Sequence, residues 1–467
     1  MTNSGIVITS KWIYPVVGAP VLQGAIVIRE KRIEALGARD ALLQQFKSYE
    51  HRDYGDAIVT PGLINLHSHL DYTALGPLET NAPLFEWIPL LMRSVAKWQP
   101  ADFFQSALYG ARLNALAGTT LIVDSSYSGQ SAEAISHAGL KGVIGLELFG
   151  LDKKTYALPW RNWLERLAKL EDQGSRELRN AIAEKRIILT CSPHAPYTVC
   201  PPLFAEAKKW AEEKQRPLLS HLAESPDECG WLQGGSEVID AYLKKVMPST
   251  PERDTDALLE SIDWKKEKAS PVKFLEAHGL LSNRLVAAHS IHVDETDMQV
   301  LKTAGVSIAH CPRSNARLRN GRAPFSAYLK AGVNAGLGTD GLPSTDNLDL
   351  IAEANFALNM HRAAEPQTKL SAEDLIEAMT MGSARAIGMA DKIGSLEKGK
   401  QADIAVFKIE PQVAEFIPAV AVQFADDVAN PADMLIRFPT RVEAVYVDGE
   451  TVVEGGRLRN LRTYASQ

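Results

Sequence analysis

The middle of this chain alternates short apolar segments with helical segments, and this alternation restricts the fold more than any other feature. Helical patterns occupy residues 101–116, 160–173, 202–214 and 294–304. Strands that alternate with helices form parallel sheets. Eight βα units predict an α/β fold of the (β/α)8 TIM-barrel type, with a doubly wound sheet as the second possibility. The eight expected strands are residues 62–69, 119–125, 142–149, 186–192, 217–223, 285–290, 306–311 and 333–340.

The two ends of the chain share a different texture. β-branched runs separated by glycine, proline and charged turns predict short strands, and Asp448–Gly449 between two such runs is a hairpin signal. These runs are residues 6–8, 24–28, 33–36, 402–407 and 442–447. We therefore expect residues 1–59 and 395–467 to form one composite β-sandwich domain. Residues 60–394 would then form the (β/α)8 barrel.

One gap in the barrel pattern, residues 230–283, is too long for a simple crossover. Its polar and charged part, residues 248–268, is expected to form an insertion over the barrel mouth.

Composition excludes several classes of protein. The net charge is −7 and no basic stripe stands out, which argues against a nucleic-acid partner. None of the four cysteines forms a C-x-x-C pair, so neither a disulfide framework nor a zinc ribbon is indicated. No basic and apolar leader opens the sequence, and no stretch reaches the ~18 apolar residues of a membrane helix. We expect a cytoplasmic protein whose partners are neither nucleic acids nor membranes.

Histidine and aspartate close several of the expected strands. His67 and His69 are two residues apart, so on a strand they share one face. His221, His289 and Asp340 close the fifth, sixth and eighth strands, at the barrel end where active sites are built. Taken singly, a histidine at such a position is explained as a buried core residue whose hydrogen bonds are made within the protein. Asp340 alone is explained as a helix N-cap. Together they predict one divalent metal, Zn²⁺ or alternatively Fe²⁺, bound by His67, His69, His221 and Asp340, with His289 as a possible fifth group.

Six short stretches resemble the amidohydrolase superfamily, and they occur in that superfamily's order. The resemblance is to the branch that holds the methylthioadenosine/S-adenosylhomocysteine deaminases, the aminofutalosine deaminases and the chlorotriazine hydrolases. The stretches are TPGLINLHSH at 60–69, SPHAPY at 192–197, HLAE at 221–224, AHCPRSN at 309–315, GTDG at 338–341 and GSLEKGKQADI at 394–404.

The resemblance implies a role for each polar residue near the strand ends. It assigns the metal to the same four ligands with His289 beside them, makes Glu224 the proton shuttle and places His194 against the substrate. A homodimer is implied only at the family level. Relatives with two metals bridge them with a modified lysine at a strand end. The third and fourth strands end at residues 147–149 and 190–192 without a lysine, which favours one metal.

These residue types fit hydrolytic chemistry at a ring carbon. A bound metal lowers the pKa of water from 15.7 toward about 7. Asp340 can accept the proton of the attacking water, and Glu224 can protonate a ring nitrogen and return a proton to the departing amine. His289 can hydrogen-bond the attacking oxygen. The alternative for Glu224 is a solvated loop glutamate. We predict Glu224, His289 and Asp340 as catalytic residues.

The segment after the first strand supplies candidate substrate contacts. Phe85 and Trp87 would form an apolar wall for a flat ring, although an amphipathic helix packed on the barrel explains the same pattern. His194 would hydrogen-bond a ring nitrogen or a sugar oxygen of the substrate. Methylthioadenosine deaminases usually carry an arginine soon after the first-strand histidines and an acid after the loop tryptophan. Residues 72–77 and 88–96 contain neither at the corresponding places, which weakens that assignment.

The sequence therefore predicts a metal-dependent deaminase of an amino-substituted N-heterocycle. An adenine-type nucleoside is the leading substrate, either aminofutalosine-like or methylthioadenosine/S-adenosylhomocysteine. The enzymatic alternatives are a dechlorinase or deaminase of triazine-like rings and a cyclic amidohydrolase. The alternative of another class is a catalytically silent barrel scaffold.

Overall fold

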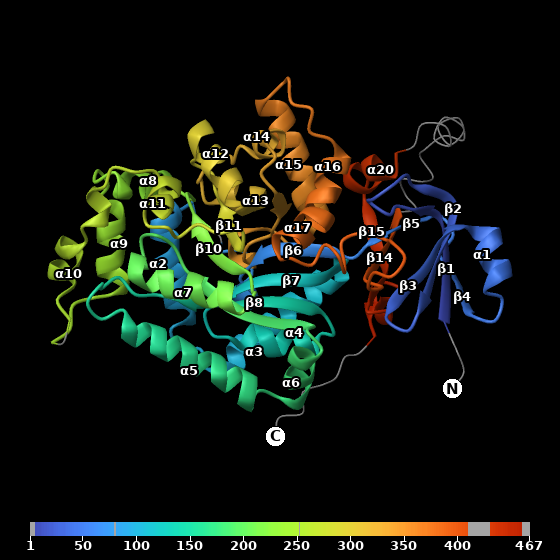
Figure 1. Ribbon diagram of the computed structural model, residues 1–467, viewed down its shortest axis with the longest axis horizontal. Helices are drawn as coiled ribbons and strands as arrows, with labels where there is room; N and C mark the ends of the chain where they lie inside the picture. The colour runs from blue at the N-terminus through green and yellow to red at the C-terminus, as the bar shows by residue number, and fades with distance from the viewer. Residues whose placement is uncertain (1–4, 79–80, 252, 410–429, 460–467) are drawn as a thin grey trace.

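Eight parallel strands form a barrel in the computed structural model, which describes residues 5–78, 81–251, 253–409 and 430–459 (Figure 1). All eight predicted strands are present at the expected places, so the TIM-barrel prediction is confirmed. In chain order, each strand pairs with the next. The strands are β6 (Leu63–Ser68), β7 (Thr119–Ser126), β8 (Lys141–Leu148), β9 (Ile187–Pro193), β10 (Leu218–Leu222), β11 (Leu285–His289), β12 (Ser307–His310) and β13 (Ala335–Leu337).

The barrel closes where its last strand meets its first. The backbone N–H of Asp340 donates a hydrogen bond to the carbonyl oxygen of His67 over 3.0 Å. A Cβ atom on Gly338 would lie 2.7 Å from the His67 backbone nitrogen, a distance that side chains do not tolerate. Only glycine permits this close approach of two backbones.

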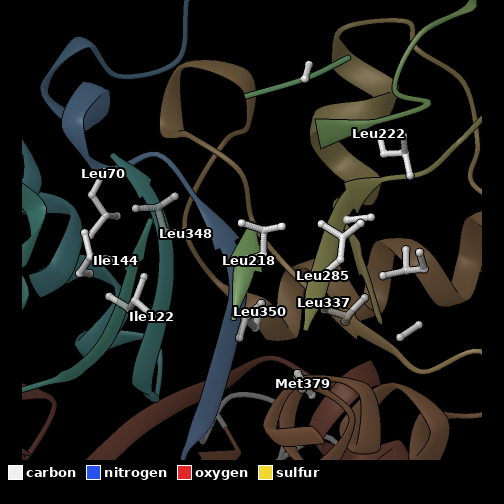
Figure 2. Close-up of a cluster of buried hydrophobic side chains, with 14 of the residues drawn as sticks. Leu70, Ile122, Ile144, Leu218, Leu222, Leu285, Leu337, Leu348, Leu350 and Met379 are labelled. Atoms are coloured by element: carbon white, nitrogen blue, oxygen red, sulfur yellow. The ribbon is translucent and has the colours of Figure 1, made fainter. Parts of the chain in front are cut away.

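Two apolar layers hold the barrel together. Leu218, Leu285 and Leu337 point outward from three strands into the layer between barrel and helices (Figure 2). Their neighbours in the chain, such as Leu219 and Val286, belong to a separate interior cluster. Burying one such side chain contributes about 1.5–3 kcal/mol, so the two layers together dominate the packing energy.

Helices cover the outside of the barrel and one helical segment closes its base. The four predicted helices appear as α3 (Pro100–Leu116), α5 (Ala157–Gln173), α7 (Pro201–Glu213) and α12 (Glu295–Ala304). Ala384 and Ala386 of α17 (Ser383–Ala386) pack into the interior cluster of the barrel. The opposite end of the barrel is left open for a site. None of the described helices is long and apolar enough to cross a membrane.

The β domain draws its strands from both ends of the chain, as predicted (Figure 1). Its strands form one hydrogen-bonded sheet in which β14 (Ile404–Ile409) lies between β5 (Ala57–Pro61) and β15 (Thr440–Val447). The Asp448–Gly449 hairpin is present between β15 and β16 (Glu450–Glu454). The remaining strands are β1 (Gly5–Ile13), β2 (Val21–Arg29), β3 (Arg32–Ala38), β4 (Glu50–Asp53) and β17 (Arg457–Leu458).

The long gap between β10 and β11 holds four α-helices. They are α8 (Pro226–Leu232), α9 (Val238–Val246), α10 (Thr255–Ser261) and α11 (Pro271–Ala277). None of the described residues of 248–268 lines the cavity at the barrel mouth, so their place over the mouth stays a prediction. The part of the insertion that borders the cavity is α9 with Met247. α9 is amphipathic, and its Tyr242, Leu243 and Val246 line the cavity.

A buried lysine joins the barrel to the β domain. Lys141 begins β8 and is 1% exposed. Its Nζ donates to both carboxylate oxygens of Asp403 at 2.7 Å, to Asp448 Oδ1 at 2.8 Å and to Gln401 Oε1 at 2.8 Å. Burial raises the pKa of Asp403, although the Lys141 ammonium opposes this change. The Lys141 ammonium therefore balances the negative charge of two buried carboxyl groups of the β domain.

We expect Lys141→Met to lower the free energy of unfolding by about 3–5 kcal/mol, because it leaves buried carboxylates without a counterion. Urea denaturation followed by circular dichroism measures the change. Lys31→Met is the matched control, since Lys31 forms an exposed pair with Glu184 at 3.6 Å and its loss should cost little. Equal stability of the two variants would contradict the role of Lys141.

Candidate metal centre and active site

Five polar side chains converge at the open end of the barrel. His67 lies on β6, and His69 follows it. His221 comes from β10, His289 ends β11, and Asp340 follows β13. The Nε2 atoms of His69 and His221 are 3.1 Å apart, and Asp340 Oδ1 is 3.7 Å from His67 Nε2 and 3.8 Å from His69 Nε2. The structure thus brings together every residue that the sequence predicts around the metal.

The strand geometry explains why these side chains meet. His221 shares the interior face of β10 with Leu219, two residues earlier, as strand alternation requires. On β6 the alternation changes, because Leu66 packs in the interior and His67 also faces the cluster. The β6–β7 register shifts between Asn65 and Ser68, and such an irregularity re-aims side chains.

The charges of the cluster suit a divalent cation. Burial lowers the pKa values of His67, His69 and His221, which keeps the imidazoles neutral. Burial alone would raise the pKa of Asp340, but the neighbouring His289, His69 and His67 lower it below its usual range. Three neutral imidazoles and a carboxylate are a typical zinc donor set.

Unpaired atoms point to the same ion. His67 Nε2 is buried and has no hydrogen-bond partner among the described residues. The donor atoms of His67, His69 and Asp340 lie within 4.8 Å of one another, and so do those of His67, His221 and His289. A cation between them would satisfy lone pairs that otherwise face each other.

Hydrogen bonds behind the cluster orient its members. His221 Nδ1 donates to the carbonyl oxygen of His194 over 2.9 Å, and His289 Nδ1 donates to Asn315 Oδ1 over 2.9 Å. Each bond leaves Nε2 with its lone pair directed at the site. Sequence reasoning assigned no role to Asn315, although it ends the AHCPRSN stretch.

Two hydroxyl groups hold the carboxylate of Asp340. Ser314 Oγ donates to Oδ2 over 2.6 Å, and Ser344 Oγ donates to the same atom over 3.1 Å. The backbone of Asp340 is in the left-handed region with φ of 60°, a conformation that costs about 1–3 kcal/mol and occurs at functional sites. Ser314 lies in the AHCPRSN stretch that resembles the superfamily, whereas nothing in the sequence singled out Ser344.

Glu224 sits beside the cluster in a fixed position. It is 5% exposed, its Oε1 accepts a hydrogen bond from Asn320 Nδ2 over 2.9 Å, and it lies 3.7 Å from His289 Nε2. Glu228 accepts hydrogen bonds from the backbone N–H groups of Ala223 and Glu224 and so fixes this turn. Burial raises the pKa of Glu224, although His289 opposes the change. A carboxyl group with a raised pKa keeps its proton more readily than an exposed one and can pass it to a bound ligand.

A cavity of about 560 Å³ opens in front of these groups. Trp87 and Leu91 of α2 (Leu84–Val95) and Tyr242 of α9 contribute to a wall of apolar and aromatic side chains. Trp87 therefore lies where the sequence predicts. Phe85 does not, because it is 3% exposed and packs behind the wall against Tyr197 and Tyr242. Side chains two positions apart on a helix point to different faces. Phe85 therefore packs behind the wall that Trp87 forms and supports it.

His194 lines the same cavity, as predicted. Its Nδ1 is 2.8 Å from Thr198 Oγ1, and its ring lies 4.9 Å from that of Phe149. Burial lowers the pKa of His194 to about 3, so the imidazole is neutral at physiological pH. Its Nε2 makes no hydrogen bond to any residue that the structure describes, which leaves it available to a ligand.

Proteins of known structure share this fold over nearly the whole chain. An adenosine deaminase from Xanthomonas campestris with bound zinc matches with a TM-score of 0.80 and 23% identity, covering 98% of this chain and 94% of the other. An atrazine chlorohydrolase from Arthrobacter aurescens complexed with zinc matches with a TM-score of 0.76 and 23% identity, covering 97% and 96%.

Sequence comparison gives the family. A protein from Syntrophobacter fumaroxidans named 5-methylthioadenosine/S-adenosylhomocysteine deaminase is 31% identical over 386 residues, which cover 82% of this chain and 79% of the relative. A protein of the same name from Desulforudis audaxviator is 30% identical over 470 residues, covering 97% and 94%. Residues 58–452 match the description of the amidohydrolase family. The resemblance seen in the sequence is thereby confirmed, and the chain belongs to the amidohydrolase family.

Proposed function

We propose that this protein is a mononuclear metal-dependent aminohydrolase that deaminates an amino-substituted N-heterocycle. The observation that carries the proposal is the placement of Glu224 beside the imidazole and carboxylate cluster, facing an apolar cavity. The deaminase names of relatives at about 30% identity support an adenine-type nucleoside as the substrate.

His67, His69, His221 and Asp340 would hold one divalent metal, Zn²⁺ or Fe²⁺. When bound, the metal would supply an activated water molecule by lowering its pKa toward about 7. The support is the set of buried donor atoms directed at one point. Since β8 and β9 end without a lysine, we propose one metal and not two.

The side chains around the cavity then carry the protons. Asp340 accepts a proton from the attacking water. Glu224 donates a proton to a ring nitrogen, which makes the adjacent ring carbon electrophilic. After the oxygen has added, Glu224 takes the proton of the new hydroxyl group and passes it to the exocyclic amine, so that the carbon–nitrogen bond breaks and ammonia leaves. The proton that Asp340 took from the water then restores the carboxyl group of Glu224. His289 hydrogen-bonds the oxygen that adds to the ring. Trp87 and the other apolar side chains of the wall hold the flat ring in position and exclude water from the cavity.

A release screen separates this function from its alternatives. Ammonia freed from adenine nucleosides, aminopurines or aminopyrimidines supports deamination. Chloride freed from a chlorotriazine would favour the dechlorinase alternative. Ring opening of a cyclic amide would favour the cyclic amidohydrolase alternative. No turnover of any compound by metal-loaded protein would support the scaffold alternative. The cytoplasmic location and the homodimer stay predictions.

We expect the purified protein to carry about one Zn²⁺ or Fe²⁺ per chain and His221→Ala to lose most of it, because one complete donor set is present. Elemental analysis measures the content. His278→Ala is the matched control, since His278 follows α11, pairs with Glu267 and is not among the candidate metal donors. Two tightly held metals per chain would contradict the mononuclear proposal, and full retention by His221→Ala would contradict the ligand assignment.

Glu224→Gln should keep the metal and lower kcat by about 10²–10⁴-fold, since an amide keeps the shape but cannot shuttle protons. KM should change much less, because the lost interaction belongs to the transition state. Steady-state kinetics on the best substrate of the screen, with metal content as a control, decide the point. A variant within tenfold of the parent enzyme would show that another group moves the proton.

His194→Ala should keep its metal and lower kcat/KM by roughly 10–150-fold, the loss of one hydrogen bond in a dry pocket. The variant retains the backbone carbonyl that orients His221, so the metal site stays intact. Metal analysis and kinetics are measured together. Loss of metal would make His194 a ligand, and unchanged kinetics on every substrate would leave it a structural residue.

A further inference from the structure

Aromatic side chains form an arc around one side of the cavity. This aromatic arc consists of Tyr72, Phe103, Tyr127 and Phe149, all of which line the cavity. Neighbouring ring centroids in this order lie 6.5, 6.3 and 6.5 Å apart, within the spacing of aromatic rings in contact. The residues of the arc come from the connections that follow β6, β7 and β8, whereas Glu224 follows β10. The aromatic arc therefore borders a different sector of the barrel mouth from Glu224.

Both ends of the aromatic arc reach the metal-binding cluster. The ring centroid of Tyr72 lies 6.4 Å from that of His69, and the ring centroid of Phe149 lies 4.9 Å from that of His194. The His194 ring in turn lies 4.8 Å from the ring of His221. The compartment inside the aromatic arc is therefore continuous with the place of the chemistry. A ligand whose reacting ring lies at the cluster can extend into this compartment.

The turn that carries Tyr127 is fixed by hydrogen bonds on both sides. The carboxyl group of Asp71 accepts hydrogen bonds from Ser126 Oγ and from the backbone N–H and Oγ of Ser128, over 2.7 to 3.2 Å. Arg166 Nη2 donates to the carbonyl oxygen of Tyr127 over 2.6 Å. These bonds hold the backbone under the Tyr127 ring in place before a ligand arrives, which lowers the entropy cost of binding against the ring.

Apolar surface is exposed to water inside the compartment. Tyr127 is 52% exposed, Phe149 is 39% exposed and Met92 of α2 is 44% exposed, and all three side chains line the cavity. Large apolar side chains that stay exposed together in a concave surface are typical of ligand-binding sites. An apolar group placed against them removes their surface and its own from water, which favours binding.

The carboxyl group of Glu147 faces this part of the cavity. On β8, Val143 packs inside the barrel, so alternation along the strand turns Glu147 inward as well, at the open end. Glu147 lines the cavity and is 4% exposed. Burial, together with the carboxyl groups of Asp71 and Asp124, raises its pKa well above the usual range and so favours the neutral form. A neutral carboxyl group is much less costly to cover with an apolar group than an ionised one.

We propose that the compartment inside the aromatic arc binds an apolar substituent of the aminoheterocycle, an aryl group or an alkyl chain of several carbons, and that Tyr127 and Phe149 are the specificity residues for it. This inference rests on the proposed deaminase function and names the substrate class for the same site. The reacting ring lies between Glu224 and the metal-binding cluster, and the substituent extends toward the ends of β7 and β8.

Three adenines that differ only in the substituent on N9 test the inference. They are 9-methyladenine, 9-butyladenine and 9-benzyladenine, which present the same amino group and carry neither a charge nor a hydroxyl group. For the metal-loaded enzyme, we expect kcat/KM for the benzyl compound to be about 10–100-fold above that for the methyl compound, because a group of the size of a phenylalanine side chain leaves water. The butyl compound should lie between the two.

Tyr127→Ala should lower the ratio of kcat/KM for the benzyl compound to that for the methyl compound by about 3–10-fold, because the contact between two aromatic rings is lost. Tyr127→Phe keeps the ring and should keep the ratio. Tyr109→Ala is the matched control, since Tyr109 on α3 is 50% exposed and is not among the described residues that line the cavity. Circular dichroism and metal content check that each variant folds. Should Tyr127→Ala not fold, Phe149→Ala replaces it.

The outcomes separate this inference from the proposed function. Equal kcat/KM for the three adenines, or an unchanged ratio in Tyr127→Ala, would overturn the inference and leave deamination standing. If none of the three is turned over, their calorimetric affinities for the metal-loaded enzyme decide. Tighter binding of the benzyl compound that Tyr127→Ala abolishes would support the inference, whereas equal affinities or no binding would overturn it. Deamination itself is decided by ammonia release from the other compounds of the screen.

Discussion

The contact between the last and the first barrel strands is the constraint on which the rest of the structure depends. Gly338 lets β13 approach β6 until the backbone of Asp340 bonds to that of His67. The same contact closes the sheet and places a carboxylate beside two imidazoles that lie more than 250 residues earlier in the chain. Barrel closure and site formation are therefore one event, because neither strand holds enough donors for a metal by itself.

Burial has two effects on the side chains around this contact between β13 and β6. It keeps the imidazoles of His67, His69 and His221 neutral and able to ligate, and it raises the pKa of Glu224 so that this carboxyl group can carry a proton. Asp340 is the exception, because the neighbouring imidazoles and hydroxyl groups hold it in the ionised form. One dry pocket thus contains groups with opposite protonation behaviour, set by their immediate neighbours.

The sequence predicts the barrel and its ligands well because both follow from local patterns, namely apolar runs and the polar residues that end them. It fails where a contact depends on tertiary geometry. Neither the register shift on β6 that re-aims His67 nor the hydroxyl of Ser344 has a local signal. Glu147 does have such a signal, because strand alternation from Val143 on β8 turns it toward the cavity. Phe85 faces away from the cavity because it is two residues from Trp87 on the same helix.

The pairing of strands in the β domain restricts the order in which this domain can fold during synthesis. Its N-terminal strands leave the ribosome first, but β5 needs β14 as a neighbour, and β14 is made only after the entire barrel. During synthesis, the edge of β5 exposes unpaired backbone groups next to the apolar start of β6, a surface prone to wrong pairing. The nascent chain therefore spends most of its synthesis with this edge of β5 unpaired.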